Sequence, residues 1–266
     1  MSLASEWAKP VGIVALSTGA YYLVRLAVVA GGASLFLRTQ IARALRVYRI
    51  AYSPGQFKSE WLATCGVIVL DAMVAGITIH FRWVQEAGRS LSKDFFSFAL
   101  LFMWIEFWFY ATHRLFHLSP LYFIHRQHHV AKVVHPLSAL SFSLAERAFT
   151  LLGFQGFAIL ASHWLPITRT GMIAYLLANY ILNVWGHLNV ELIPGAFLKK
   201  FPGKMFITSS FHAMHHARYK GHYGLFTTVL DRFLGTFWAD YPQVHDRARR
   251  GEGLLGLGER IEAGAE

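Results

Sequence analysis

Long, nearly uninterrupted runs of apolar residues constrain this chain more than any other feature of its sequence. A helix that crosses the hydrocarbon core of a bilayer needs about 20 mostly apolar residues, and several runs approach that length. Hydrophobic residues make up 55% of the 266 positions and charged residues only 15%, which is too apolar a balance for a water-soluble domain. The sequence therefore predicts an all-α fold, a polytopic bundle of membrane helices.

Five segments are predicted to cross the membrane. They are residues 11–37, 62–81, 95–112, 148–165 and 170–185. Pro166 and a short polar link separate the last two, which is typical of a hairpin that returns to the side it came from. We interpret residues 1–242 as one integral-membrane domain. Residues 243–266 are rich in glycine and charge and lack apolar periodicity, so we expect a polar, flexible tail there.

Basic residues predict the orientation of the bundle. The link between the first two segments carries one acid, Glu60, against the basic residues Arg38, Arg43, Arg46, Arg49 and Lys58. Short loops with such an excess stay in the cytoplasm, so every histidine-rich stretch is expected on the cytoplasmic side. The net charge of +10 then reflects topology and lipid headgroups, not nucleic acid. A bacterial inner membrane and the endoplasmic reticulum fit equally well.

Fourteen histidines, most of them in three short stretches, predict a metal site. One stretch has two histidines four residues apart, and the other two have histidines at i, i+3 and i+4. Such residues share a helix face, so each stretch is expected to present its imidazoles in one direction. Without a metal, rings so crowded would need separate hydrogen-bond partners and would repel when protonated. The predicted ligands are His113, His117, His125, His128, His129, His212, His215 and His216.

The number of imidazoles and their apolar surroundings indicate which metal to expect. Eight imidazoles exceed the four ligands that one zinc ion takes, so two ions are implied. Imidazole suits iron, zinc, copper and nickel, but zinc has no redox chemistry, and the unactivated C–H bonds of an apolar substrate need an oxidant. We therefore expect two iron ions that work with O2, with zinc as a substitute in a purified sample. The single cysteine, Cys65, excludes a cysteine-rich zinc or iron–sulfur site.

Four stretches carry a family resemblance: HRLFH (113–117), HRQHH (125–129), HAMHH (212–216) and HYGLFTTVLDRFLGTF (222–237). They resemble the fatty acid hydroxylase/sterol desaturase superfamily of membrane di-iron enzymes. The resemblance implies a cytosol-facing helical cap that holds two irons, and an O2-dependent oxidoreductase that hydroxylates or desaturates a lipid, fatty-acyl or sterol-like substrate. It also makes His187 a ninth ligand. The chain shows no cytochrome b5-like or ferredoxin-like segment, so we expect a separate cytochrome b5-, ferredoxin- or rubredoxin-like electron donor with its reductase.

Two further histidines depart from the family pattern. His222 stands where a segment resembling NYG would have asparagine, and His135 stands before Pro136 where relatives often have another polar residue. Each is a candidate for a tenth ligand or for a group behind the ligands. A structural role is the alternative for both.

Other polar residues are candidates for orienting the imidazoles. Glu106 and Tyr110 share a helix face with His113, and an acid at such a position can accept an imidazole N–H. Asn183 and Glu191 lie four residues on either side of the ninth expected ligand and are candidates for the same role. Ordinary helix-end positions explain these last two equally well.

Two other functions stay open. A zinc-dependent membrane hydrolase is disfavoured because the sequence has no HExxH, and O2-independent turnover with bound zinc would favour it. A non-enzymatic membrane metal-binding protein would have histidines at membrane depth, whereas these lie mostly beyond the ends of the predicted spans. The sequence selects neither the substrate nor hydroxylation over desaturation.

Overall fold

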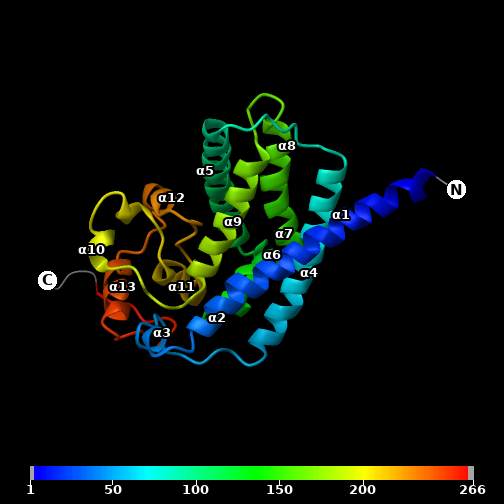
Figure 1. Ribbon diagram of the computed structural model, residues 1–266. Helices are drawn as coiled ribbons and strands as arrows, with labels where there is room; N and C mark the ends of the chain where they lie inside the picture. The colour runs from blue at the N-terminus through cyan, green and yellow to red at the C-terminus, as the bar shows by residue number, and fades with distance from the viewer. Residues whose placement is uncertain (1–2, 263–266) are drawn as a thin grey trace.

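The computed structural model describes residues 3–262, with side chains from residue 10 onward, as a helical bundle with a smaller helical cap at one end (Figure 1). The bundle consists of α1 (Leu3–Arg25), η1 (Leu26–Gly31), α2 (Gly32–Phe36), α4 (Gln56–His80), α5 (Leu91–Phe116), α7 (Leu144–Leu151), η4 (Leu152–Gly156), α8 (Phe157–Ala161) and α9 (Arg169–Gly186). The cap and its connections consist of α3 (Gln40–Ala44), α6 (Tyr122–His125), η2 (His128–Val130), η3 (Pro136–Leu140), α10 (Gly195–Leu198), η5 (Gly203–Met205), α11 (Ser209–Arg218), α12 (Val229–Phe233) and α13 (Tyr241–Arg249). Residues 3–262 contain isolated bridges but no β-strand, which confirms the predicted all-α class.

Four helical stretches are long and apolar enough to cross a membrane. They are Pro10–Phe36, Gln56–His80, Leu91–Phe116 and Leu144–Ala161. The first contains the π-helical η1 and the fourth the π-helical η4, so each is one continuous rod with a local π-turn. The predicted fifth span, residues 170–185, coincides with α9, which is not among these four; its crossing of the membrane stays a prediction.

Small side chains allow α1 and α4 to pack closely along their length. A Cβ atom added to Gly76 of α4 would lie 2.9 Å from the Cβ of Ala15, and one added to Gly19 of α1 would lie 3.5 Å from the Cβ of Ala72. Close approach at small residues is the usual way that membrane helices associate. The pairing fixes one wall of the bundle.

Polar residues at the first turn start the other bundle helices. Ser90, Ser143 and Thr168 each accept a hydrogen bond from a main-chain N–H in the first turn of α5, α7 and α9 respectively. Such capping satisfies donors that the helix itself leaves free. The three helices therefore begin at defined residues, and for α5 and α9 this fixes where the histidines at their C-terminal ends lie.

The cap has its own apolar core. Phe211 and Met214 of α11 are buried together with Tyr48, Val244 and Leu254. Residues 243–262 therefore differ from the flexible tail expected there, because α13 and the segment after it bury apolar side chains against α11. Residues 263–266 of the expected tail lie outside the described residues.

Candidate metal centre

Nine imidazoles gather in two groups where the bundle meets the cap. The five-histidine group contains His113, His117, His125, His129 and His215, and the four-histidine group contains His128, His187, His212 and His216. Within each group one ring nitrogen per residue lies within 4.8 Å of all the others. The histidines come from the C-terminal ends of α5 and α9, from α6 and η2, and from α11. All nine are predicted ligands, and the structure brings them together.

The grouping does not follow the sequence stretches. In α11, His212 and His216 belong to the four-histidine group, whereas His215 belongs to the five-histidine group. Successive helical residues are rotated by about 100° around the helix axis. Seen along α11, His215 and His216 therefore lie on either side of His212. His128 and His129 are divided in the same way. The expectation that each stretch presents its imidazoles in one direction is therefore wrong, since the two longer stretches serve both groups.

Main-chain carbonyls fix the orientation of most rings. The Nδ1 atoms lie near carbonyl oxygens in five cases: His113 to Tyr223 at 2.9 Å, His128 to Ser141 at 3.3 Å, His187 to Asn183 at 2.7 Å, His215 to Gly221 at 2.8 Å and His216 to Ala131 at 2.8 Å. A carbonyl oxygen only accepts, so each Nδ1 carries the proton and donates it. The Nε2 atom of each ring is left with a lone pair and no hydrogen.

These Nε2 lone pairs face one another. The Nε2 atom of His215 lies 2.9 Å from that of His113 and 3.1 Å from that of His129, and the Nε2 atom of His216 lies 3.1 Å from those of both His128 and His212. Lone pairs this close repel unless a cation lies between them. Two nitrogens bound at right angles to an ion at about 2.1 Å would be about 3.0 Å apart. The geometry therefore fits metal coordination in both groups.

Burial keeps the rings neutral, as metal binding requires. Burial, reinforced by neighbouring imidazoles, holds the pKa of His128, His212 and His216 well below the ordinary value. Burial also lowers the pKa of His187 to about 4, although its hydrogen bond to the Asn183 carbonyl acts in the opposite direction. A neutral imidazole is the form that binds a metal ion.

Glu146 orients a ring through its side chain, and sequence reasoning missed it. Its Oε1 atom lies 2.6 Å from Nδ1 of His125, with both side chains buried. Ser143 accepts from the main-chain N–H of Glu146 at the start of α7, which fixes the backbone of the acid. A carboxylate behind a ligating histidine sets its tautomer and raises its basicity. The available signal was an acid just before the predicted apolar span 148–165, 21 residues from the histidine that it contacts.

Glu106 holds a loop instead of accepting from an imidazole, which corrects its predicted role. Its carboxylate accepts from the main-chain N–H groups of Phe226 and Thr227 and from the Thr227 hydroxyl. Tyr110 likewise contacts Thr236, with 2.9 Å between their oxygens, and no ring nitrogen. Both residues therefore tie α5 to the segment 221–236, which supplies carbonyl oxygens to the five-histidine group.

Asp231 shapes the same segment from the other side. Its carboxylate accepts from the main-chain N–H groups of Tyr223 and Gly224 at 2.8 Å and 2.7 Å, and from the hydroxyl of Thr236. A Cβ atom at position 224 would lie 2.3 Å from the carbonyl oxygen of Thr227, so only glycine fits there. The turn aims the carbonyls of residues 221 and 223 at His215 and His113.

The side chains of Asn183 and Glu191 do not orient the ring of His187, which was one of the two alternatives that the sequence left open for them. Asn183 does orient His187, but through its main-chain carbonyl; its side chain bonds to Asn179. Glu191 accepts from the main-chain N–H and hydroxyl of Ser210, in the first turn of α11. A carboxylate there stabilises the start of a helix, so Glu191 positions the helix that carries three of the histidines instead of one ring.

His222 and His135 lie outside both groups. The Nδ1 atom of His222 donates to the carbonyl of Phe211, its Nε2 atom accepts from the main-chain N–H of Trp238, and its ring stacks on Phe211 at 3.6 Å. His135 accepts from the main-chain N–H of Leu137 at the start of η3. The contacts of both residues are structural, and neither faces the two histidine groups.

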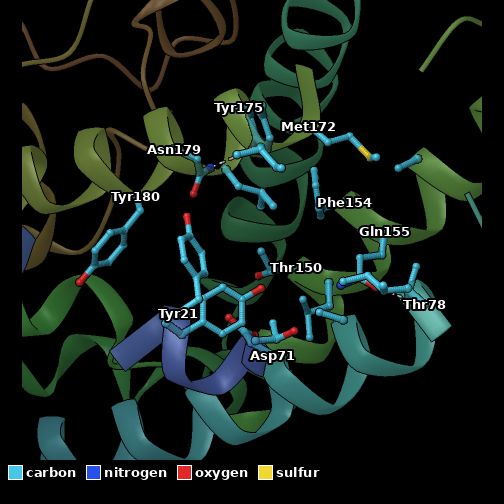
Figure 2. Close-up of a pocket in the computed structure, with 18 of the residues that line it drawn as sticks. Tyr21, Asp71, Thr78, Thr150, Phe154, Gln155, Met172, Tyr175, Asn179 and Tyr180 are labelled. Atoms are coloured by element: carbon cyan, nitrogen blue, oxygen red, sulfur yellow. Dashed lines mark hydrogen bonds between the residues drawn. The ribbon is translucent and has the colours of Figure 1, made fainter. Parts of the chain in front are cut away.

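A cavity of about 1180 Å³ lies inside the bundle, and two of its lining residues, Phe109 and Phe142, contact the rings of His113 and His128. Figure 2 shows Tyr21 and Asp71 on the wall formed by α1 and α4, with Tyr175 and Asn179 on the α9 side. At the inner end the cavity is lined by Phe142, which stacks on His128 at 4.6 Å, by Phe109 and by Asn183. An apolar substrate in this cavity would therefore approach the two groups from within the membrane part.

Residues 98–236, slightly more than half of the chain, match the fatty acid hydroxylase family. The chain belongs to this family. The matched region runs from α5 to α12 and contains all nine histidines, so the resemblance predicted from the sequence is confirmed. The cavity wall that helices α1 and α4 form lies outside the residues that match the fatty acid hydroxylase family.

Several curated relatives of the chain are plant proteins. The chain is 31% identical over 156 residues to very-long-chain aldehyde decarbonylase GL1-6 of Oryza sativa subsp. indica, and 30% identical over 160 residues to very-long-chain aldehyde decarbonylase CER1 of Arabidopsis thaliana. It is 33% identical over 136 residues to protein CER1-like 1 of Arabidopsis thaliana. These alignments cover 50–57% of this chain but 22–25% of the relatives, so the chain spans about a quarter of their length. No solved structure matches the chain.

Proposed function

We propose that this chain is an O2-dependent di-iron oxidoreductase that hydroxylates or desaturates a C–H bond of a lipid-like substrate at the membrane. The observation that carries the proposal is the convergence of nine imidazoles in two groups, which Phe109 and Phe142 separate from a cavity inside the bundle. Family membership supports it, because the match includes every one of these histidines. The four apolar helical stretches support a membrane location.

The two groups would each hold one iron ion through Nε2 atoms. Imidazole is a suitable ligand for iron, and a pair of such ions supplies the redox chemistry that O2-dependent oxidation of a C–H bond needs. The protein's own contribution is orientation. Carbonyl oxygens and Glu146 hold the ring tautomers, so the lone pairs point inward before any ion binds.

The cavity would bind the apolar part of the substrate. Its wall is formed mainly by aliphatic and aromatic residues of the bundle helices, which exclude water from the substrate chain. Phe109 and Phe142 lie between the cavity and the rings of His113 and His128, so they define how closely a substrate carbon approaches each group. We propose that a separate protein supplies electrons from the cytoplasmic side, where the basic loop between the first two spans would lie.

A second reaction is favoured by the names of two relatives. The rice and Arabidopsis proteins are called very-long-chain aldehyde decarbonylases, so removal of the carbonyl carbon of a fatty aldehyde is the alternative outcome at the same site. Oxidation of a C–H bond and removal of a carbonyl carbon would both act on a long-chain lipid, so the product is what distinguishes the two reactions.

Lipid mass spectrometry of cells with and without the full-length protein tests the proposal. Hydroxylation adds the mass of one oxygen atom to a lipid, desaturation removes the mass of two hydrogens, and decarbonylation shortens the chain by one carbon. We expect one of the first two changes with the wild-type protein and none with His128→Ala or His215→Ala, whose iron content should also fall. Unchanged lipids, or turnover without O2 in a zinc-loaded protein, would contradict the proposal.

A further inference from the structure

Arg25 places a positive charge in the membrane part of the cavity wall. It is the last residue of α1, lies within the apolar stretch Pro10–Phe36, and is only 8% exposed. It lines the cavity, and the π-helical η1 begins at the next residue. A charge at membrane depth is costly and usually marks a functional site, and π-turns are frequent at such sites.

Arg25 differs from Arg147, the other buried arginine of the cavity wall, in its lack of an acidic partner. Arg147 is held by both carboxylate oxygens of Asp71, at 2.7 Å and 2.6 Å, and Arg169 pairs with Glu86 at the far end. The remaining one, Arg82, is exposed. Among the described residues, no hydrogen bond or ion pair satisfies the guanidinium of Arg25, and its Nε atom is buried without a partner.

The contacts that Arg25 does make leave its donors free. The guanidinium carbon lies 4.7 Å from the ring centre of Tyr22 and 4.1 Å from that of Tyr180. Such contacts use the flat faces of the guanidinium, whereas its N–H donors lie in the plane at the edge. Together with Arg147 and Asp71, Arg25 gives this part of the wall two positive charges against one negative charge. The unmatched charge and the free donors complement a carboxylate, which binds arginine through two parallel hydrogen bonds.

We propose that Arg25 anchors the free carboxylate of a single-chain lipid acid whose apolar chain occupies the cavity. This rests on the proposed function in taking the cavity as the substrate site, and it deepens that function by selecting a free acid over an ester or an aldehyde. Tyr180, which stacks on Arg25, precedes His187 by seven residues, about 10 Å along α9. Arg25 is therefore a positioning residue at the histidine end of the cavity and not a ligand.

Binding of three probes to the full-length, iron-loaded protein tests the inference. The probes are palmitate, methyl palmitate and hexadecanal, which share a chain length and differ at the polar end. At pH 8 the wild-type protein should bind palmitate about 10–100-fold more tightly than either neutral probe, because a hydrogen bond to a charged group is stronger than a neutral one. Arg25→Met should abolish this preference, Arg25→Lys should keep part of it, and Arg43→Met, at an exposed position of α3, should leave it unchanged.

Equal affinities of the three probes for the wild-type protein would overturn the inference, as would a palmitate preference that survives in Arg25→Met. If Arg25 only stabilised the fold, Arg25→Met would lower the melting temperature of the ligand-free protein; loss of an unpaired buried charge should instead leave it equal or higher. If Arg25→Met does not fold, two measurements still test the inference. The wild-type protein must prefer palmitate to the neutral probes, and Arg25→Lys must keep only part of that preference. Binding does not require turnover, so the two proposals fail separately. A palmitate preference without oxidation would contradict only the proposed function, and oxidation without a palmitate preference would contradict only the role of Arg25.

Discussion

The five-histidine and four-histidine groups use the same side chain but differ in what surrounds it. Every orienting partner identified in the four-histidine group is a neutral main-chain carbonyl, from Ala131, Ser141 and Asn183. The five-histidine group adds a carboxylate, Glu146, and contains one ring that is only half-buried, His117. The four-histidine group is wholly buried.

This difference suggests unequal roles for two bound ions. A carboxylate behind a ligand donates electron density through the ring and stabilises positive charge on the ion. A half-buried ring leaves that group closer to solvent. The four-histidine group has no ligand to spare and no charged partner, so it should be the more fragile towards loss of a ring and the less sensitive to removal of a carboxylate.

The largest expected effect is loss of one ring from the smaller group. His216→Ala leaves three imidazoles there, below the four that normally close a site, and should lower bound iron from about two ions to about one per chain. His129→Ala leaves four imidazoles in the other group, so we expect retained iron with affinity weakened about 10–100-fold. Metal analysis by mass spectrometry of the purified proteins measures both, with His163→Ala, at an exposed site, as control. If His216→Ala and His129→Ala lost the same amount of iron, the two histidine groups would not differ in their tolerance to loss of a ring.

A smaller and more selective effect should follow from Glu146→Gln. This change keeps the shape of the side chain but removes the negative charge behind His125. Metal titration should show one of two binding steps weakened by about 10–100-fold and the other unchanged. Glu252→Gln, at an exposed position, is the matched control. Weakening of both steps together would mean that the groups do not differ in this respect.

The last effect concerns acid and leaves bound iron unchanged, so it separates the stability of the fold from the histidine groups. Burial lowers the pKa of His135 to about 4 from the ordinary 6.5. As the pH falls from 6.5 to 4 the unfolded chain binds a proton at this residue and the folded chain does not, so the contribution of His135 to the free energy of unfolding should fall by about 1.4 kcal/mol per pH unit. His135→Gln should lose less stability over that range, at unchanged iron content. Thermal unfolding of the metal-free protein at pH 7 and pH 4.5 measures this; identical pH dependence in both proteins would contradict it.

The roles of polar residues around the histidines were harder to predict than the histidines themselves. Helical spacing placed Glu106 near His113, yet its carboxylate is used by a loop 120 residues later in the chain. Glu146 was missed because nothing local links it to His125. Asn183 orients His187 with a main-chain atom, which no side-chain pattern reveals. Hydrogen-bond partners behind a ligand depend on which distant segments meet.

The sequence by itself determined the helical class and eight of the nine candidate ligands, because apolar run length and the spacing of imidazoles are properties of local chain geometry; the ninth, His187, came from the family resemblance. Only the tertiary structure decided how those imidazoles divide into five and four. The rotation between neighbouring residues of α11 sends His215 and His216 to different groups, and that choice depends on where α5, α9 and η2 bring their own rings. The same holds for Arg25, whose lack of an acidic partner is visible only once Arg147 is seen to occupy Asp71.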